Sequence, residues 1–159
     1  MQQCVTSLLF VVVYCCQFDE NRVVSGSADA TLRIWDTTTG KTKHVLTGHE
    51  AEIYCLQYND VVIASGSADS SVRVWNHQGL CLHELKEHLG IVRCLHLTRT
   101  RLVTGGDVRK IIIWDTERGE MCNIIHRNPT SLHQMWVDDT RLITASPDAP
   151  GTITIINFW

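Results

Sequence analysis

The sequence predicts an all-β protein built from four successive units of about 40 residues, and two observations carry this prediction. The first is an internal repeat: residues 25–36 (SGSADATLRIWD) and 65–76 (SGSADSSVRVWN) share seven of twelve positions, and residues 104–115 (TGGDVRKIIIWD) are a looser third copy. The second is that each unit contains four short apolar, β-branched segments separated by Gly, Asn, Asp and Ser. These lengths are typical of strands, and no helical period runs long enough to compete.

The tryptophans set the phase of the repeat, because Trp35, Trp75 and Trp114 are 40 and 39 residues apart. A second block repeats upstream of each copy, as VYCCQF at 13–18, IYCLQY at 53–58 and VRCLHL at 92–97, with a weaker fourth instance, LHQMWV, at 132–137. The last unit ends in RLITASPDAPGTITIINFW, where Ile156 takes the place of the tryptophan. In the second unit the spacing predicts strands at 52–58, 61–66, 71–76 and 80–86.

Four strands in about 40 residues correspond to one blade of a β-propeller, a fold of four-stranded sheets arranged radially. The predicted blade units are approximately 10–48, 49–87, 88–127 and 128–159. Residues 1–9 are in the register of a strand that completes a neighbouring or the last blade.

Composition excludes several classes of protein. With 44% hydrophobic and 19% charged residues among 159, the chain can bury a core, and its net charge of −3 provides no basic surface for nucleic acid. The apolar run LLFVVVYCC at 8–16 is too short to span a bilayer as a helix, which needs about 20 residues. The odd number of cysteines, seven, and the absence of an N-glycosylation acceptor favour a reducing compartment. We therefore expect a cytoplasmic or nuclear protein without nucleic-acid or membrane partners.

The repeated blocks, over residues 13–157, resemble the WD-repeat (β-transducin-like) family. CLQY and SGSADSSVRVW in particular resemble the F-box/WD-repeat substrate receptors of ubiquitin ligases. The resemblance implies a β-propeller whose rings usually have seven blades, of which about four are present here. It also implies a buried hydrogen-bonded set of His, Ser or Thr, Asp and Trp in each blade. The members of this set would be His49, Ser67, Asp69 and Trp75 in the second unit, Ser27, Asp29 and Trp35 in the first, and His88 and Trp114 in the third.

Only the second unit contains the whole set. Leu9 occupies the histidine position of the first unit, Asn128 that of the fourth, and Val108 replaces the turn aspartate of the third. We therefore expect changes in the second unit's set to destabilise the protein more than matching changes in the third.

A variable position points to partner binding. Cys15, Cys55 and Cys94 repeat in register, which indicates core packing. The position before the cysteine varies among the four units and holds Tyr14, Tyr54, Arg93 and His133. In the F-box/WD receptors this position faces the substrate-binding mouth, and Tyr and Arg are enriched at interface hot spots. The predicted partner-binding residues are Tyr54 and Arg93, then Glu52, Tyr14 and His133. The alternative is that they are ordinary residues lining the central channel.

Motifs for catalysis and for metal binding are absent from the sequence. It contains no G-x-S-x-G and no C-x-x-C, and its Ser, His and Asp recur together with Trp, as a structural set would. We expect no cofactor, no metal and no enzymatic activity.

The predicted function is that of a scaffold binding a peptide or protein on the top face, where the resemblance suggests a phosphorylated target of a ubiquitin ligase. The alternative is an assembly subunit with no role in ubiquitination. Four blades shaped for a larger ring would leave open edges, so we also expect self-association or pairing with missing blades. The chain would then be the C-terminal part of a larger propeller, or a short form that must pair to close.

Overall fold

The computed structural model describes residues 11–108, 110–125, 131–138, 140–147 and 150–157. Within these ranges the chain forms strands and no helix, so the predicted all-β class is confirmed. The strand expected at 1–9 lies outside the described residues. None of the described segments is a helix long and apolar enough to cross a membrane.

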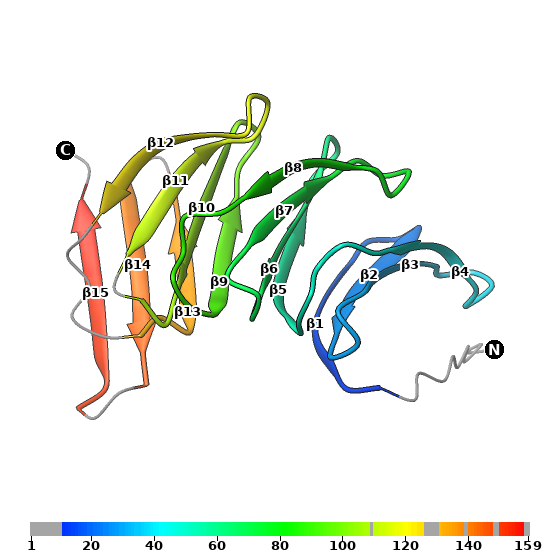
Figure 1. Ribbon diagram of the computed structural model, residues 1–159, viewed down its shortest axis with the longest axis horizontal. Coiled ribbons are helices and arrows are strands. Elements are labelled where there is room, and N and C mark those ends of the chain that lie inside the picture. Colours follow the sequence, from blue (N-terminus) through cyan, green and yellow to red (C-terminus); the bar gives the residue numbers. More distant parts are fainter. Residues whose placement is uncertain (1–10, 109, 126–130, 139, 148–149, 158–159) are drawn as a thin grey trace.

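The strands form four antiparallel sheets that follow one another along the chain in a curved array (Figure 1). Three sheets have four strands each, and the described part of the fourth has three. In each sheet the strands pair in sequence order, as expected for propeller blades. The strands are β1 (Val13–Phe18), β2 (Arg22–Ser27), β3 (Leu32–Asp36), β4 (Thr42–Leu46), β5 (Ile53–Tyr58), β6 (Ile63–Ser67), β7 (Val72–Trp75), β8 (Cys81–Leu85), β9 (Val92–Leu97), β10 (Arg101–Gly106), β11 (Ile111–Asp115), β12 (Glu120–Ile125), β13 (Gln134–Val137), β14 (Arg141–Ser146) and β15 (Thr152–Asn157).

Side-chain oxygens of Asp and Asn close the hairpins within each sheet. Between the first and second strands, Asp19 and Asn59 accept hydrogen bonds from backbone N–H groups two and three residues ahead. Between the third and fourth strands, Asp36 and Asp115 accept in the same way, and Asn76 accepts from the N–H groups two and four residues ahead. Such local acceptors favour turns over continued strand, which explains why these residue types separate the predicted segments.

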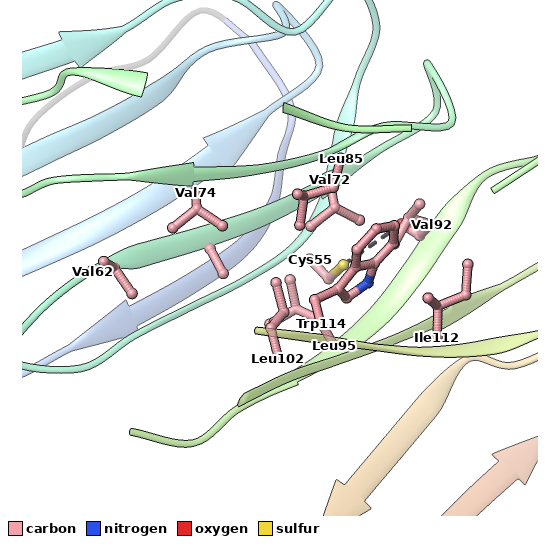
Figure 2. Packing of buried hydrophobic residues seen from close by; sticks show 11 residues of the cluster. Cys55, Val62, Val72, Val74, Leu85, Val92, Leu95, Leu102, Ile112 and Trp114 are labelled. Carbon is pink, nitrogen blue, oxygen red and sulfur yellow. Dashed lines mark hydrogen bonds between the residues drawn. The ribbon is translucent and has the colours of Figure 1, made fainter. Parts of the chain in front are cut away.

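The hydrophobic core lies between the sheets. We call the side of a sheet toward the preceding sheet its front face and the opposite side its back face. Ile53, Leu56 and Tyr58 on the front face of the second sheet pack against Val24 and Leu32 of the first. We call the packed contact between two successive sheets a joint. Figure 2 shows the joint between the second and third sheets, where Leu95, Leu102 and Trp114 of the third sheet pack against Cys55, Val72 and Val74 of the second.

A glycine in the second strand of each of the first three sheets lets the next sheet approach closely. A Cβ added at Gly66 would lie 2.5 Å from Val92 Cγ1, and one at Gly26 would lie 2.8 Å from Ile53 Cγ2. Gly105 stands in the same relation to Leu132 of the fourth sheet, at 2.8 Å from its Cδ1. These separations are too short for real carbon atoms, so the joint requires glycine at this position.

The repeated cysteines belong to the same joints. The thiol of Cys15 donates to the Ile53 carbonyl at 3.7 Å, that of Cys55 to Val92 at 3.6 Å and that of Cys94 to Leu132 at 3.9 Å. Burial raises the pKa of Cys15 and of Cys94 to about 12, and that of Cys55 well above its usual value. The three thiols therefore stay protonated and act as packing groups with a weak donor.

Glutamine side chains add hydrogen bonds across the first two joints. Gln17 donates to the Tyr58 carbonyl at 3.1 Å and accepts from the Tyr58 N–H at 2.7 Å. Gln57 accepts from the Leu97 N–H at 2.7 Å in the next joint. At the same register position the third sheet has His96 and the fourth has Trp136, so these two sheets have no glutamine to make this hydrogen bond.

Replacing Gly66 by alanine should destabilise the protein by about 1–3 kcal/mol, because the new methyl group overlaps Val92 and Cys55. Urea unfolding followed by circular dichroism measures the change. Gly151→Ala is the matched control, since the nearest atom to its added Cβ, the Ser146 carbonyl oxygen, is 3.7 Å away. Equal midpoints for both variants would show that the joint does not depend on glycine.

Candidate functional site

Three side chains predicted to bind a partner form a continuous row across the first three sheets. Tyr14 on β1 stacks on Tyr54 on β5, with ring centroids 4.7 Å apart and planes at 24°. The Arg93 guanidinium on β9 lies over the Tyr54 ring, with its Cζ 5.3 Å from the ring centroid. We call these three residues the cross-sheet row. Tyr14 is exposed, and Tyr54 and Arg93 are half-buried.

A β-bulge at the start of each first strand explains this arrangement. In the first sheet Val13 pairs with Ser27 and Cys15 with Gly26, so Tyr14 has no partner of its own. The ladder skips Tyr54 and Arg93 in the same way in the second and third sheets. A bulge turns the extra residue out of the normal alternation, which re-aims its side chain. Three bulges in the same register therefore bring the row together.

Asp107 holds the charged end of the row. The Nε and Nη2 atoms of Arg93 donate to the two carboxylate oxygens of Asp107, with 3.1 Å between Nη2 and Oδ2. The carboxylate raises the pKa of Arg93 above its usual value. The sequence did not predict this role of Asp107. Its position directly after the TGG segment gave no signal that it faces Arg93.

Tyr54 lies in an environment that disfavours its ionised form. Burial raises its pKa, Tyr14 and Glu52 raise it further, and Arg93 opposes them. The phenol therefore remains a neutral donor at neutral pH. Glu52 is half-buried beside the row, and its carbonyl accepts a hydrogen bond from the Ala68 N–H at 2.9 Å.

The row does not extend into the fourth sheet within the described part of the chain. His133 is exposed just before β13, and its backbone N–H donates to Ala145 at 3.2 Å. No ring contact among the described residues joins His133 to Arg93. The partner-binding roles of Tyr14, Glu52, Tyr54, Arg93 and His133 stay predictions.

The second sheet also contains a buried hydrogen-bond network. Trp75 Nε1 donates to Ser65 Oγ at 2.9 Å, and the Ser65 hydroxyl is 2.8 Å from His49 Nε2. His49 Nδ1 is 2.8 Å from Asp69 Oδ2. Because the carboxylate only accepts, Nδ1 carries the proton and Nε2 accepts from Ser65. Every polar group of this network is thereby paired.

The serine of the network is Ser65 and not Ser67, which corrects the sequence prediction. Ser67 lies two residues further along β6, where its hydroxyl donates to the Ala51 carbonyl at 2.9 Å and accepts from the Asp69 N–H at 3.1 Å. Both serines lie on one face of the strand, so the SGS motif alone did not separate them. A signal was present, because only the first position of the motif keeps a hydroxyl as Ser25, Ser65 and Thr104.

The same correction applies to the first sheet, and the third sheet has a hydroxyl that the sequence prediction did not include. In the first, Trp35 donates to Ser25 at 2.9 Å, whereas Ser27 donates to Asp29. In the third, Trp114 donates to Thr104 at 2.8 Å, and His88 Nε2 lies 2.8 Å from the same hydroxyl. Leu9 and Asn128, the predicted substitutes for histidine, lie outside the described residues.

The Ser65–His49–Asp69 chain has the order of a hydrolase triad but not its accessibility. Ser65 is fully buried, and its oxygen already accepts from Trp75. A nucleophile has to reach a substrate, so we interpret this chain as part of the structural framework. Among the described residues, no group of His, Cys, Asp or Glu is arranged to hold a metal ion.

Successive antiparallel sheets with a buried tryptophan–hydroxyl–histidine network define a repeat protein of the propeller class. A family model described as "WD domain, G-beta repeat" matches residues 3–36, 40–76 and 79–115. These segments cover more than half of the chain, and the protein therefore belongs to the WD-repeat family. This membership supports a role as a protein-interaction scaffold.

Relatives and solved structures agree with this assignment. Human apoptotic protease-activating factor 1 is 30% identical over 150 residues, which are 87% of this chain but 12% of that protein. F-box/WD repeat-containing protein 7 of Drosophila melanogaster is 50% identical over 38 residues, 24% of this chain and 3% of that protein. The crystal structure of the computationally designed Ika4 protein matches over 100% of both chains, with a TM-score of 0.89 and 27% identity. The chain thus spans only a small part of the curated relatives that it matches.

Replacing His49 by alanine should destabilise the protein more than replacing His88. His49 contacts the side chains of Asp69, Ser65 and Ser71, so its loss removes three polar contacts, whereas His88 contacts only Thr104 among the described residues. Each buried hydrogen bond lost costs about 0.5–1.5 kcal/mol, and more where the partner is charged. Thermal unfolding of both variants measures the difference, and equal shifts in melting temperature would contradict it.

Acid should destabilise the fold through these histidines. Burial, assisted by Lys110, lowers the pKa of His88 to about 4, and burial lowers the pKa of His49 despite Asp69. An unfolded histidine has a pKa of about 6.5, so below that pH the unfolded chain binds protons that the folded chain does not. The stabilisation is complete above about pH 6.5 and is lost as the pH falls toward 4.

The variant His88→Gln should flatten this dependence by up to about 1.4 kcal/mol per pH unit, the effect of one proton. Urea unfolding at a series of pH values between 7 and 5 measures it. His44→Gln, at an exposed histidine, is the control and should keep the slope of the unmodified protein. An unchanged slope for His88→Gln would show that His88 is not responsible.

Proposed function

We propose that this chain is a non-catalytic scaffold whose cross-sheet row binds a peptide segment of a partner protein. The observation that carries the proposal is the contact chain from Tyr14 through Tyr54 to Arg93, which joins three sheets in a single surface. Two aromatic faces supply a large contact area at a low entropic cost, and a guanidinium adds directional donors. These are the residue types enriched at interface hot spots.

The row is separate from the groups that hold the sheets together. The joints depend on Gly26, Gly66 and Gly105 with the repeated cysteines, which occur in each of the first three sheets. The row instead changes residue type between the second sheet, which has Tyr54, and the third, which has Arg93. A change in the row can therefore alter partner choice without removing the joints.

A phosphorylated or acidic partner is the finer form of this proposal. Arg93 would donate to the phosphate, as guanidinium groups commonly do. In the free protein Asp107 already occupies Nε and Nη2 of Arg93. A phosphate would thus compete with Asp107 for these donors, and the carboxylate would weaken binding by repulsion.

The test uses pools of phosphorylated and unphosphorylated peptides on the immobilised chain. Tyr54→Ala and Arg93→Glu should reduce peptide retention about tenfold or more, which is the loss expected on removing a hot-spot residue. The matched control is Arg118→Glu, which alters an exposed arginine in the turn between β11 and β12. Retention by both row variants equal to that of the unmodified chain would contradict the proposal.

Asp107→Asn separates the phosphate form from the general one. If Arg93 reads a phosphate, releasing it from the carboxylate should increase retention of phosphorylated peptides and leave unphosphorylated peptides unchanged. Equal effects on both pools would reject the phosphate form while leaving peptide binding intact. Folding of each variant is checked by its melting temperature.

A role as a substrate receptor of a ubiquitin ligase is the most specific version of the proposal. Its support is the similarity to F-box/WD-repeat proteins over a short segment. We propose a cytoplasmic or nuclear location, and the free cysteines among the described residues support this proposal. Ubiquitin-ligase subunits that co-purify with both the unmodified chain and Arg93→Glu, together with a ubiquitinated target that is lost only in Arg93→Glu, would support this version, and the absence of ligase subunits from the purified complex would oppose it.

The second candidate is an assembly subunit of a multiprotein complex with no role in ubiquitination. The observation that favours it is the exposure of apolar side chains on the first and fourth sheets, which include Phe18 and Ile153. Here the ends of the array, and not the row, would make the contacts. A complex that survives Tyr54→Ala but is lost in Phe18→Glu would favour this candidate.

A further inference from the structure

Among the described residues, none covers the front face of the first sheet. Val13 and Phe18 are 43% and 75% exposed, whereas Ile53 and Tyr58, at the same register positions of the second sheet, are 0% and 9% exposed. Cys16 is also exposed, at the position where the second sheet buries Leu56. The residue types on this face remain those of a packed joint.

The back face of the fourth sheet exposes apolar residues at positions that are buried in the interior joints. Ile153 and Ile155 are 75% and 58% exposed, whereas Val72 and Val74, which hold the same positions in the second sheet, are fully buried. Trp136 is 51% exposed on this face. A hollow of about 160 Å³ lies here, lined by Gln134, Met135, Trp136, Ile143, Thr144 and Ala145.

These two faces lie at opposite ends of the array (Figure 1). We propose that they form one joint between two copies of this chain, in which the front face of each first sheet packs on the back face of the other copy's fourth sheet. This inference is independent of peptide binding at the cross-sheet row.

The interior joints supply the geometry for this contact. At the first joint, Gln17 on the back face accepts a hydrogen bond from the Tyr58 N–H on the first strand of the next sheet. At the second joint, Gln57 accepts from the Leu97 N–H in the same way. Trp136 of the fourth sheet corresponds in register to Gln57 on a back face, and Phe18 of the first sheet corresponds to Tyr58 on a front face. Docking in the same register therefore places the exposed Trp136 against the exposed Phe18.

A second copy fits better than a partner with a charged surface. The lining of the hollow contains no charged side chain, and Val13 and Phe18 are apolar. A second copy necessarily carries the matching face, and a reciprocal pair covers both faces of both chains, as in a closed head-to-tail ring. Ala145 stands where interior joints have glycine, so this joint must be wider than those within the chain. We therefore expect a reversible association.

Analytical ultracentrifugation of the full chain from about 1 to 100 µM tests the proposal, because this range brackets a micromolar dissociation constant. We expect the mass to rise from the 18.0 kDa of one chain to twice that value. Phe18→Glu and Ile153→Glu should each remain monomeric, whereas their equimolar mixture should associate again, since a mixed pair keeps one intact joint. Leu80→Glu, at an exposed residue in the second sheet, is the matched control and should still pair.

Labelling of Cys16 gives an independent readout. Alkylation of Cys16 should slow as the protein concentration rises, whereas alkylation of the exposed Cys122 should not. The far-ultraviolet spectrum and melting temperature show that each variant is folded. A monomer at all concentrations, or growth beyond two copies, would overturn the proposal. Loss of pairing in only one of the two face variants would indicate contact between like faces and would also overturn it.

Discussion

The approach of each sheet's first strand to a glycine of the preceding sheet is the constraint on which the rest of the molecule depends. Only a residue without a side chain leaves room for Ile53, Val92 and Leu132 at these joints. The approach buries the aliphatic side chains between the sheets and brings the cysteine thiols within reach of backbone carbonyls. Sheets of this size are too small to be stable alone, so each depends on its neighbours for a core.

The same joint also positions the candidate binding surface. The bulges that precede Cys15 and Cys55 free Tyr14 and Tyr54 from the ladder, and the fixed spacing of the sheets then allows their rings to stack at 4.7 Å. Arg93 completes the row because its sheet repeats the bulge. A rigid framework thus presents side chains whose identities can differ without altering the framework, as scaffolds require.

The sequence predicted the fold well because its signals are local and repeated. Trp35, Trp75 and Trp114 fix the phase, and the turn residues Asp19 and Asn59 make the hydrogen bonds that end the strands. The network serine was assigned to Ser67, because two serines on one strand face differ only in their distance from Trp75, which pattern alone does not measure. The pairing of Arg93 with Asp107 joins residues on different strands of one sheet, and only the structure reveals it. The exposed end faces were expected from the sequence, whereas the matching register of Phe18 and Trp136 in the proposed pair was not.

The central claim is that one type of joint, front face on back face, organises both the interior and the ends of the array. Hydrogen exchange measured by mass spectrometry at low and high protein concentration tests it most directly. We expect β5, β6, β9 and β10 to be protected at every concentration, and β1, β13 and β14 to gain protection as the concentration rises. Protection of β1, β13 and β14 that does not change with concentration, or exchange in the central strands as fast as in the end strands, would contradict it.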